Sequence, residues 1–301
     1  MSSAVIVTEG LTKYYGKSRG VVDLDIEVRE GEVFGFLGPN GAGKTTTIRL
    51  LLDLIRPTRG RAYLFGLDSR RDSLQVRRRC GHLPGELALY EKMSGADLLR
   101  FFANLRGGVS WSYVEELAER LDGELSAPIR SISRGNKQKI GLIQALMHQP
   151  ELLILDEPTA GLDPLVQQEF YRIIASCRAE GRTVFVSSHN LPEVERLCDR
   201  VGIICEGRLV DLVEVASLKK RALRRLEVHF ASPPPPDALR GVPGVVDLHA
   251  DEVVVHCTVR GSMDLLIKAL ARFEVVNIVS HEPSLEEVFL RYYERGGSDA
   301  E

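Results

Sequence analysis

One octapeptide fits the pattern G-x-x-x-x-G-K-[ST]: Gly38-Pro39-Asn40-Gly41-Ala42-Gly43-Lys44-Thr45. Its glycines let the backbone wrap around a phosphate with the N–H groups pointing inward, and a following helix would present the positive end of its dipole to that phosphate. Lys44 can pair with the β- and γ-phosphates of a nucleotide, and the Thr45 hydroxyl can bind Mg²⁺. We assign Thr46, the next residue, to the same loop. The octapeptide predicts a binding site for a nucleoside triphosphate.

The residues on either side of the octapeptide agree with this prediction. The apolar run at 33–37 before it is typical of a buried strand. After it, Ile48, Leu51, Leu52 and Ile55 recur at helical spacing, so we predict an amphipathic helix over 44–55. A chance glycine-rich turn is the alternative interpretation, but such a turn would not have a strand before it and a helix after it.

A second strand end carries the acids that a nucleoside triphosphatase needs. The apolar run at 152–155 is followed directly by Asp156 and Glu157. Asp156 can hold Mg²⁺, directly or through water, and Glu157 can polarise the attacking water as a general base. Because ligands of open α/β sheets bind at the carboxyl ends of the strands, we expect both loops to face one crevice. A solvated acidic turn is the alternative interpretation, and the nearby phosphate loop makes it the weaker one.

The composition is that of an ordinary globular protein. The chain has 301 residues, of which 44% are hydrophobic and 27% charged, so a core can form without disulfides. A net charge of -3 provides no basic field for nucleic acid. The five cysteines form no CxxC pair, which favours a reducing cytosol. We find no signal peptide and no apolar run near the roughly 20 residues of a membrane helix, so we expect another chain to cross any membrane.

Strands and helices alternate through the first two thirds of the sequence. Apolar runs at 183–187 and 201–205 add predicted strands, and 170–179 is predicted to be helical. This alternation predicts the α/β fold of a P-loop NTPase with a mostly parallel sheet. Strands at 4–7 and 21–28 are predicted to form an N-terminal antiparallel β portion.

Two domains are expected from the changes in composition. The first, 1–215, contains the phosphate loop and a helical subdomain at about 87–135, where strand signals are few. A basic stretch and a proline run at 233–236 follow it. The second domain, 216–301, is predicted to be a small α+β accessory domain. Its predicted strands are 225–230, 245–250, 252–259 and 275–280, and its predicted helices are 263–273 and 285–293.

A third motif shortly before Asp156 reads Ser133-Arg134-Gly135-Asn136-Lys137-Gln138. Ser133 and Gly135 precede a predicted helix and would form a second anion site at its N-terminus. By itself the hexapeptide would fit an ordinary capped helix. Together, however, the three motifs resemble those of the ATP-binding subunits of ABC transporters. In that family two subunits enclose two ATP molecules head to tail, and each ATP contacts the phosphate loop of one subunit and this signature motif of the other.

The resemblance implies roles for three further residues. Asp163, in Gly161-Leu162-Asp163, matches the aspartate that lies between the two subunits. His189, after the predicted strand 183–187, matches the histidine that reaches the γ-phosphate, although a lone histidine at a strand end is more often structural. Tyr15 matches the aromatic residue that stacks on adenine, and without the resemblance it would be assigned to the core.

Two positions depart from the family's pattern. Gly85 occupies the place where the family usually has a glutamine that contacts Mg²⁺ and couples to the membrane subunit, and the neighbouring Glu86 is the candidate substitute. Arg134 stands where the signature usually has glycine. Because Ser133 and Gly135 on either side of it are the phosphate-facing pair, we expect the signature to function.

The resemblance implies an ATP-hydrolysing subunit that energises transport, with ATP and Mg²⁺ as cofactors. The short phosphate loop and the C-terminal domain resemble those of bacterial exporters of the drug- or lipid-efflux kind. The implied partners are a separate transmembrane permease subunit and a second ATP-binding subunit, with a homodimer as the default. The expected location is peripheral, on the cytoplasmic face of the cell membrane, with no nucleic-acid partner.

Other functions remain as alternatives. One is a non-transport ABC ATPase that acts in DNA repair or translation, but the chain has neither a long coiled-coil insertion nor a second nucleotide domain. Another is a regulator that binds nucleotide without hydrolysis, against which Glu157 and His189 argue. An importer subunit would have much the same sequence over its first 215 residues.

Overall fold

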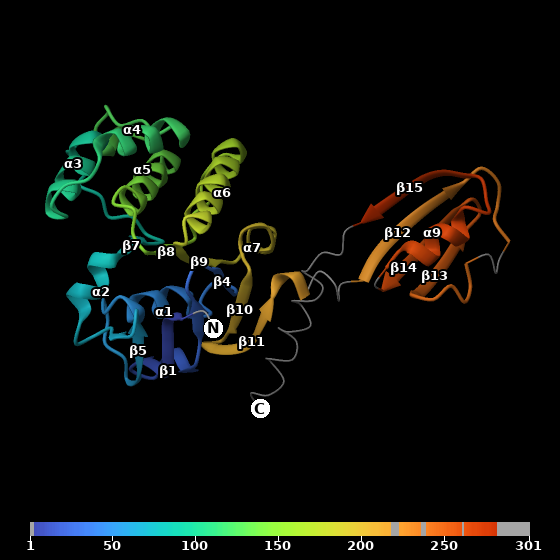
Figure 1. The fold of residues 1–301 in the computed structure, drawn as a ribbon, viewed down its shortest axis with the longest axis horizontal. Coiled ribbons are helices and arrows are strands. Elements are labelled where there is room, and N and C mark those ends of the chain that lie inside the picture. The colour runs from blue at the N-terminus through green and yellow to red at the C-terminus, as the bar shows by residue number, and fades with distance from the viewer. Residues whose placement is uncertain (1–2, 218–222, 236–238, 261, 282–301) are drawn as a thin grey trace. The chain divides into compact units, whose positions relative to one another are not determined.

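A computed structural model describes residues 3–217, 223–235, 239–260 and 262–281. The chain divides into two compact units, Met1–Val213 and Glu214–Glu301, which are described separately below (Figure 1).

The first unit contains a six-stranded sheet with the order β11-β10-β4-β9-β8-β7. Neighbours pair in parallel from β10 to β7, so the prediction of a mostly parallel α/β sheet is confirmed. Three of these strands are buried at every residue, which explains why they appear in the sequence as continuous apolar runs. The strands are β4 (Val33–Leu37), β7 (Cys80–Leu83), β8 (Leu152–Asp156), β9 (Thr183–Ser188), β10 (Arg200–Cys205) and β11 (Arg208–Glu214).

An antiparallel sheet packs beside the parallel one, as predicted for the N-terminal portion. Its strands are β1 (Ala4–Tyr15), β2 (Ser18–Leu24), β3 (Glu27–Arg29), β5 (Arg59–Leu64) and β6 (Leu67–Asp68). The prediction of one strand over 21–28 was wrong, because one strand ends at Leu24 and another begins at Glu27. Asp23 has a left-handed backbone, with φ of 49°, and β2 and β3 pair with different parts of β1. A strictly alternating pattern cannot reveal such a break.

Aromatic rings of two neighbouring parallel strands meet in the core. The ring of Phe185 in β9 lies 5.7 Å from that of Phe34 and 5.5 Å from that of Phe36, both in β4, and all three side chains are fully buried. Because β4 leads into the phosphate loop and β9 ends near His189, this contact supports both parts of the site.

Replacing Phe185 with alanine should therefore leave a cavity under the site. We expect a loss of about 3–5 kcal/mol in the free energy of unfolding of the first unit. Denaturant titration would measure it. The matched control is Leu105→Ala, because Leu105 is 68% exposed and its removal should change stability by less than about 0.5 kcal/mol. Equal stability of the two variants would contradict this account of the core.

Some helices of the first unit pack against the parallel sheet, and others form a separate group beside it. In Figure 1, α3, α4 and α5 lie together next to α6. The predicted helical stretch is two helices, because Gly107 and Gly108 between them both have positive φ. The helix predicted to reach residue 55 ends at Leu51, since Asp53 has a left-handed backbone with φ of 55°. The helices are α1 (Lys44–Leu51), α2 (Ser73–Arg79), α3 (Gly95–Leu105), α4 (Trp111–Arg120), α5 (Arg134–Leu146), α6 (Pro164–Ala179) and α7 (Leu191–Leu197).

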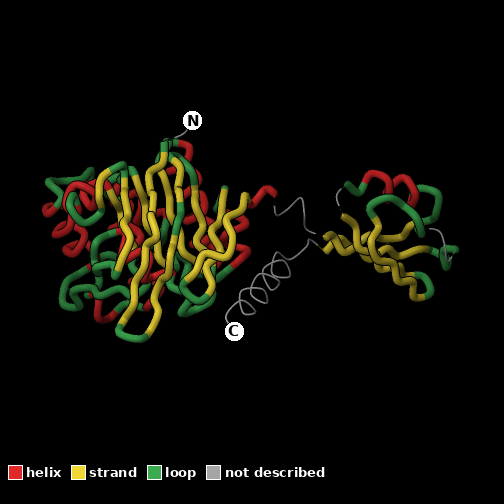
Figure 2. Tube along the Cα trace, turned by 90° about the horizontal axis from the view of Figure 1, so that it is seen from below, coloured by secondary structure: helices red, strands yellow, loops and turns green. Residues whose placement is uncertain are grey.

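In the second unit the described residues form a four-stranded antiparallel sheet, and the helix α9 (Asp264–Leu270) lies over one face of it (Figure 2). Leu266 and Leu270 of this helix pack against Val228 and Val255 of the sheet. The strand order is β13-β14-β12-β15, and all pairs are antiparallel. The bounds are β12 (Leu223–Phe230), β13 (Val245–Asp251), β14 (Val254–Arg260) and β15 (Val275–His281), close to the predicted strands. The helix predicted at 285–293 lies outside the described residues.

Candidate nucleotide-binding site

The predicted phosphate loop joins β4 to α1 and has glycines where the backbone leaves no room for a side chain. A Cβ on Gly38 would lie 2.3 Å from the Ile204 carbonyl oxygen, and one on Gly43 would lie 2.6 Å from that of Gly20. Gly41 and Gly43 also have positive φ, of 81° and 109°. Gly43 is the N-cap of α1, so the unpaired N–H groups of the first helical turn belong to this loop. The loop is therefore built as an anion site would require.

Lys44 lies over this loop and is buried. Its Nζ donates hydrogen bonds to the carbonyl oxygens of Gly38, at 2.6 Å, and Pro39, at 3.2 Å. The same atom is 3.3 Å from Oε1 of Glu157, which has no hydrogen bond of its own within the described residues. The Lys44 cation is thus what offsets the buried charge on this oxygen.

Thr45 and Asp156 are in direct contact, although they are far apart in the sequence. The Thr45 hydroxyl donates to Oδ2 of Asp156 at 2.7 Å, and the Ser187 hydroxyl donates to Oδ1. A hydroxyl and a buried carboxylate are hard oxygen ligands, which suit Mg²⁺. No cluster of three or more His, Cys, Asp or Glu side chains suited to a metal occurs in the described part of the chain. These residues therefore fit an Mg²⁺ ion that takes most of its ligands from phosphate and water.

Gly85 lies against the same carboxylate. A Cβ at this position would be 3.0 Å from Oδ2 of Asp156, so a side chain here would require the acid to shift. Glycine in place of the family's glutamine therefore leaves no side chain at the position that lies against Asp156. Glu86 is exposed, and its role as a substitute stays a prediction.

Glu157 and His189 meet at the ends of two adjacent strands. Asp156 of β8 is in register with Ser187 of β9, which brings the residues that follow them together. Nδ1 of His189 is 2.8 Å from Oε2 of Glu157. The Glu157 side chain is 22% exposed and that of His189 57%, so both can reach a molecule outside the fold. Glu157 also has a left-handed backbone, with φ of 50°, and such strain in a non-glycine residue is common at functional sites.

The signature residues form a second, separate group. Ser133 is the N-cap of α5, where its Oγ accepts a hydrogen bond from the Asn136 N–H. Gly135 packs against the Gly161 carbonyl, which a Cβ would approach to 2.7 Å. Ser133, Gly135 and Asp163 line one pocket, and none of residues 38–45 is among the residues that line it. The structure thus brings Ser133, Gly135 and Asp163 together in a pocket that the phosphate loop does not line.

Asp163 and Arg134 have different surroundings in this second group. Asp163 is the N-cap of α6, and its carboxylate accepts from the N–H groups of Val166, at 3.0 Å, and Leu165, at 3.1 Å. Hydrogen bonding from the Val166 N–H is the main cause that lowers the pKa of Asp163. Arg134 is the first residue of α5, and it lines the same pocket with its side chain exposed.

Tyr15 lies at the end of β1 and is not a core residue, since it is 46% exposed. A Cβ on Gly20 would touch both Cε2 of Tyr15, at 3.0 Å, and Cγ2 of Thr46, at 3.1 Å. Tyr15 is therefore close to the start of α1, and the Lys13 ammonium lies 5.2 Å from the centroid of its partly exposed ring.

Sequence reasoning missed two residues of the site. Ser187 holds Asp156, and Gln138 donates from Nε2 to the carbonyl oxygens of Glu157, at 3.3 Å, and Pro158, at 3.1 Å. Gln138 is the last residue of the signature hexapeptide and links α5 to the loop that follows β8. A hydroxyl inside an otherwise apolar run was the only available signal for Ser187.

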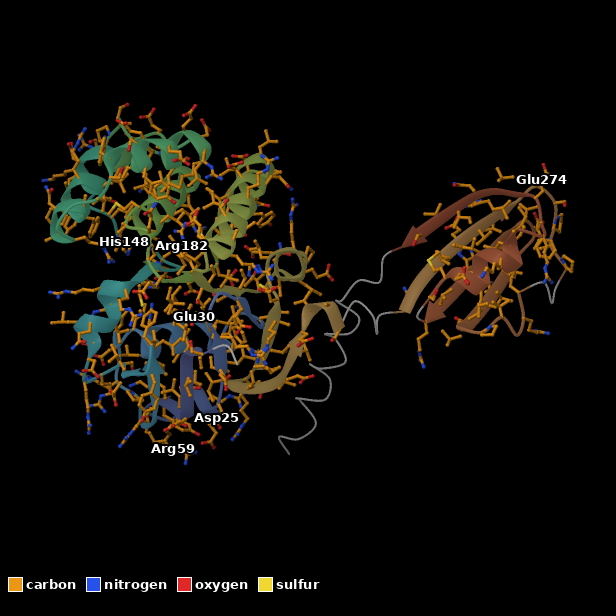
Figure 3. The ribbon with its side chains drawn as sticks, viewed as in Figure 1. Asp25, Glu30, Arg59, His148, Arg182 and Glu274 are labelled. Atoms are coloured by element: carbon orange, nitrogen blue, oxygen red, sulfur yellow. The ribbon has the colours of Figure 1, made fainter. Side chains whose placement is uncertain are left out.

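His148 shows what a structural histidine looks like in this protein. It is labelled in Figure 3, and its Nε2 is 3.1 Å from the carbonyl oxygen of Cys80. Burial, with the nearby Arg106, lowers the pKa of His148 to about 4, so it stays neutral at physiological pH. His189, in contrast, is exposed and contacts an acid.

Comparisons with known proteins agree on one family. Residues 21–160 match the family model described as ABC transporter. The bacitracin transport ATP-binding protein BcrA of Bacillus licheniformis is 37% identical over 96% of this chain and 97% of its own length. A fluoroquinolones export ATP-binding protein of Mycobacterium tuberculosis is 33% identical over 96% of this chain and 93% of its own length.

Solved structures show the same likeness over about 70% of the chain. One, described as the ATP-binding subunit of an ABC transporter, has a TM-score of 0.65 and 29% identity and covers 72% of this chain and 92% of its own. A dimeric bacterial ABC transporter cassette also has a TM-score of 0.65, with 20% identity over 70% of this chain and 98% of its own, and shares the fold.

Proposed function

This chain belongs to the ABC transporter family of ATP-binding proteins, and from that we propose that it hydrolyses ATP to drive export through a separate membrane-spanning subunit. One observation carries the proposal. Lys44, Asp156, Glu157 and His189 converge at the carboxyl ends of β4, β8 and β9, where α/β sheets bind their ligands.

In the proposed mechanism the phosphate loop and Lys44 bind the phosphates of ATP. Lys44 gives up its hydrogen bonds to Gly38 and Pro39 and pairs with the phosphates instead. Tyr15 stacks on the adenine. Thr45 and Asp156 would hold Mg²⁺, and the ion would supply positive charge to the phosphate oxygens.

Glu157 and His189 carry out the hydrolytic step as a pair. Glu157 orients the attacking water and accepts its proton. Because Nδ1 of His189 faces Oε2 of Glu157, the Nε2 side of the ring is available to the γ-phosphate. The exposed position of His189 lets the ring turn toward that phosphate when ATP binds.

Two subunits are proposed to act together. Ser133, Gly135 and Asp163 line a pocket that contains none of the phosphate-loop residues. In a head-to-tail pair, the signature of one subunit would complete the site of the other, with Ser133 contacting the γ-phosphate. The likeness to a dimeric cassette of the same fold supports this arrangement.

We propose export because two relatives have names that refer to transport or export. One is a bacitracin transport protein and another a fluoroquinolones export protein. No helix among the described residues is long and apolar enough to cross a membrane. We therefore propose that a separate permease forms the transport path and that this chain binds to it at the cytoplasmic face of the membrane.

Fractionation of the cells that make the protein tests this proposal. We expect the chain to sediment with membranes and, after detergent extraction, to purify together with a membrane-spanning protein. ATP hydrolysis by that complex should depend on Mg²⁺. Sedimentation with ribosomes or with DNA repair complexes, with none of the chain in the membrane fraction, would overturn the transport proposal in favour of the non-transport alternative.

A further inference from the structure

A buried glutamate lies behind the paired residues Glu157 and His189. Glu193 belongs to α7 and is 2% exposed. Its Oε2 accepts a hydrogen bond from the Ser188 hydroxyl at 2.5 Å, and the Thr159 hydroxyl lies near enough to this carboxyl group to help lower its pKa. Ser188 directly precedes His189, and Thr159 comes two residues after Glu157. The Glu193 carboxyl group thus hydrogen-bonds to the residue before His189 and lies near the loop that contains Glu157.

The contact with Ser188 extends to both sides of His189. The Ser188 hydroxyl accepts a hydrogen bond from the Asn190 N–H at 2.9 Å, so the residues before and after His189 are tied to each other. The carbonyl oxygen of Ser188 accepts from the Gly38 N–H at 3.3 Å, at the start of the phosphate loop. The backbone of His189 is therefore set by a network that ends on the Glu193 carboxyl group.

Packing alone does not explain a carboxyl group at this position. Burial raises the pKa of Glu193, and the nearby Glu157 adds to that effect, while the hydroxyls of Ser188 and Thr159 oppose it. Oε1 of Glu193 is buried and has no hydrogen-bond partner among the described residues. Such a group costs stability. The buried side chains of Leu191 and Val194 already anchor α7 by apolar packing.

We propose that Glu193 is a positioning residue for ATP hydrolysis, which holds His189 against Glu157 through the hydrogen bond that it accepts from Ser188. This inference rests on the proposed function, in which Glu157 and His189 carry out the hydrolytic step. The loop that binds the phosphates, 38–45, has no direct contact with Glu193 in these interactions. Loss of the carboxyl group should therefore affect turnover more than nucleotide binding.

The test compares Glu193→Ala and Glu193→Gln in the full chain. Because a displacement of about 1 Å can cost a hundredfold in rate, we expect Glu193→Ala to lower kcat by about 10- to 100-fold. The KM for ATP should stay within about threefold, since the phosphate loop keeps its contacts. Glu193→Gln retains an oxygen that accepts from Ser188 and should recover most of the lost turnover.

Val194→Ala is the matched control for loosening of the helix. Val194 is the next residue of α7 and is buried, but it makes none of these hydrogen bonds. We expect its kcat to stay close to that of the unchanged protein even if its melting temperature falls. An equal loss in Val194→Ala and Glu193→Ala would overturn the proposal, and so would unchanged turnover in Glu193→Ala or a glutamine variant as slow as the alanine one.

The same assay separates this proposal from the one on which it rests. If the unchanged protein hydrolyses ATP and Glu157→Gln does not, the proposed function stands, and the Glu193 variants alone decide the inference. If Glu157→Gln hydrolyses ATP as fast as the unchanged protein, Glu157 is not the general base and the inference falls while ATP hydrolysis by this chain stands. If the unchanged protein does not hydrolyse ATP, the proposed function and the inference both fall.

Discussion

Glu157→Gln is expected to bind ATP and to hydrolyse it at least about a hundredfold more slowly than the unchanged protein. General-base catalysis contributes about 10²- to 10⁴-fold, and the amide cannot accept a proton from water. Lys44, Thr45 and the phosphate loop are unaltered, so nucleotide binding should persist. A phosphate-release assay with Mg-ATP measures the rate, and a fluorescent nucleotide measures the affinity.

The matched control lies at the other end of the same strand. Glu151 directly precedes β8, and its exposed side chain pairs with Arg79. Glu151→Gln makes the same chemical change away from the site and should hydrolyse ATP at the normal rate. Near-normal turnover in Glu157→Gln would remove Glu157 from the role of general base.

The same variant tests the head-to-tail pair. An inactive subunit that still binds ATP should accumulate in the closed form, so we expect Glu157→Gln to become a dimer when Mg-ATP is added. Light scattering with and without Mg-ATP measures this directly. A dimer would also establish that Arg134 and Gly85 leave the two-site arrangement functional. A nucleotide-bound monomer would contradict the homodimer and would mean that closure needs the membrane partner or a different second subunit.

Lys44→Ala is expected to have the second large effect, on binding as well as on turnover. Nζ of Lys44 is the cation that lies among the loop carbonyls and next to Glu157. Hydrogen bonds to a charged group contribute about 1.5–3 kcal/mol, so ATP affinity should fall by about 10- to 100-fold. Hydrolysis should fall to background, because the charge that stabilises the transferred phosphoryl group is lost.

Two further variants make this result interpretable. Lys92→Ala removes an exposed lysine of the same unit and should bind and hydrolyse ATP normally. Lys44→Met removes the charge but fills most of the volume, so a melting temperature near the normal value would show that the fold is retained. Normal affinity for ATP in both Lys44 variants would exclude Lys44 from the phosphate site.

For the small second unit, the sequence pattern predicts the fold but not the function. Its four strands were predictable, because alternating β-branched runs end at clear turns such as that at Glu252, which has φ of 48°. What this unit binds does not follow from that pattern, since the chemistry of a site depends on side chains that the sheet brings together.

Much of the first unit could likewise be predicted from local signals. The strands β4, β8 and β9 are buried on both faces, so they are continuous apolar runs in the sequence. The phosphate loop is recognisable because Gly38 and Gly43 stand where a side chain would clash with nearby backbone. By contrast, β5, β6 and β7 were not predicted. The last of these, Cys80–Leu83, is short and contains Gly81, whose place against the Ala145 carbonyl only the folded chain creates.

The sequence by itself determined the class of the protein, its phosphate loop and the acids that follow β8, because each depends on residues that are neighbours along the chain. Tertiary structure alone decided which of these groups touch. The pairing of Asp156 with Ser187 follows from the register of β8 and β9, and the contact of Glu193 with Ser188 follows from the packing of α7. The first contact joins the ends of two adjacent strands and the second joins a strand end to the helix that follows it, and no periodicity in the sequence records either of them.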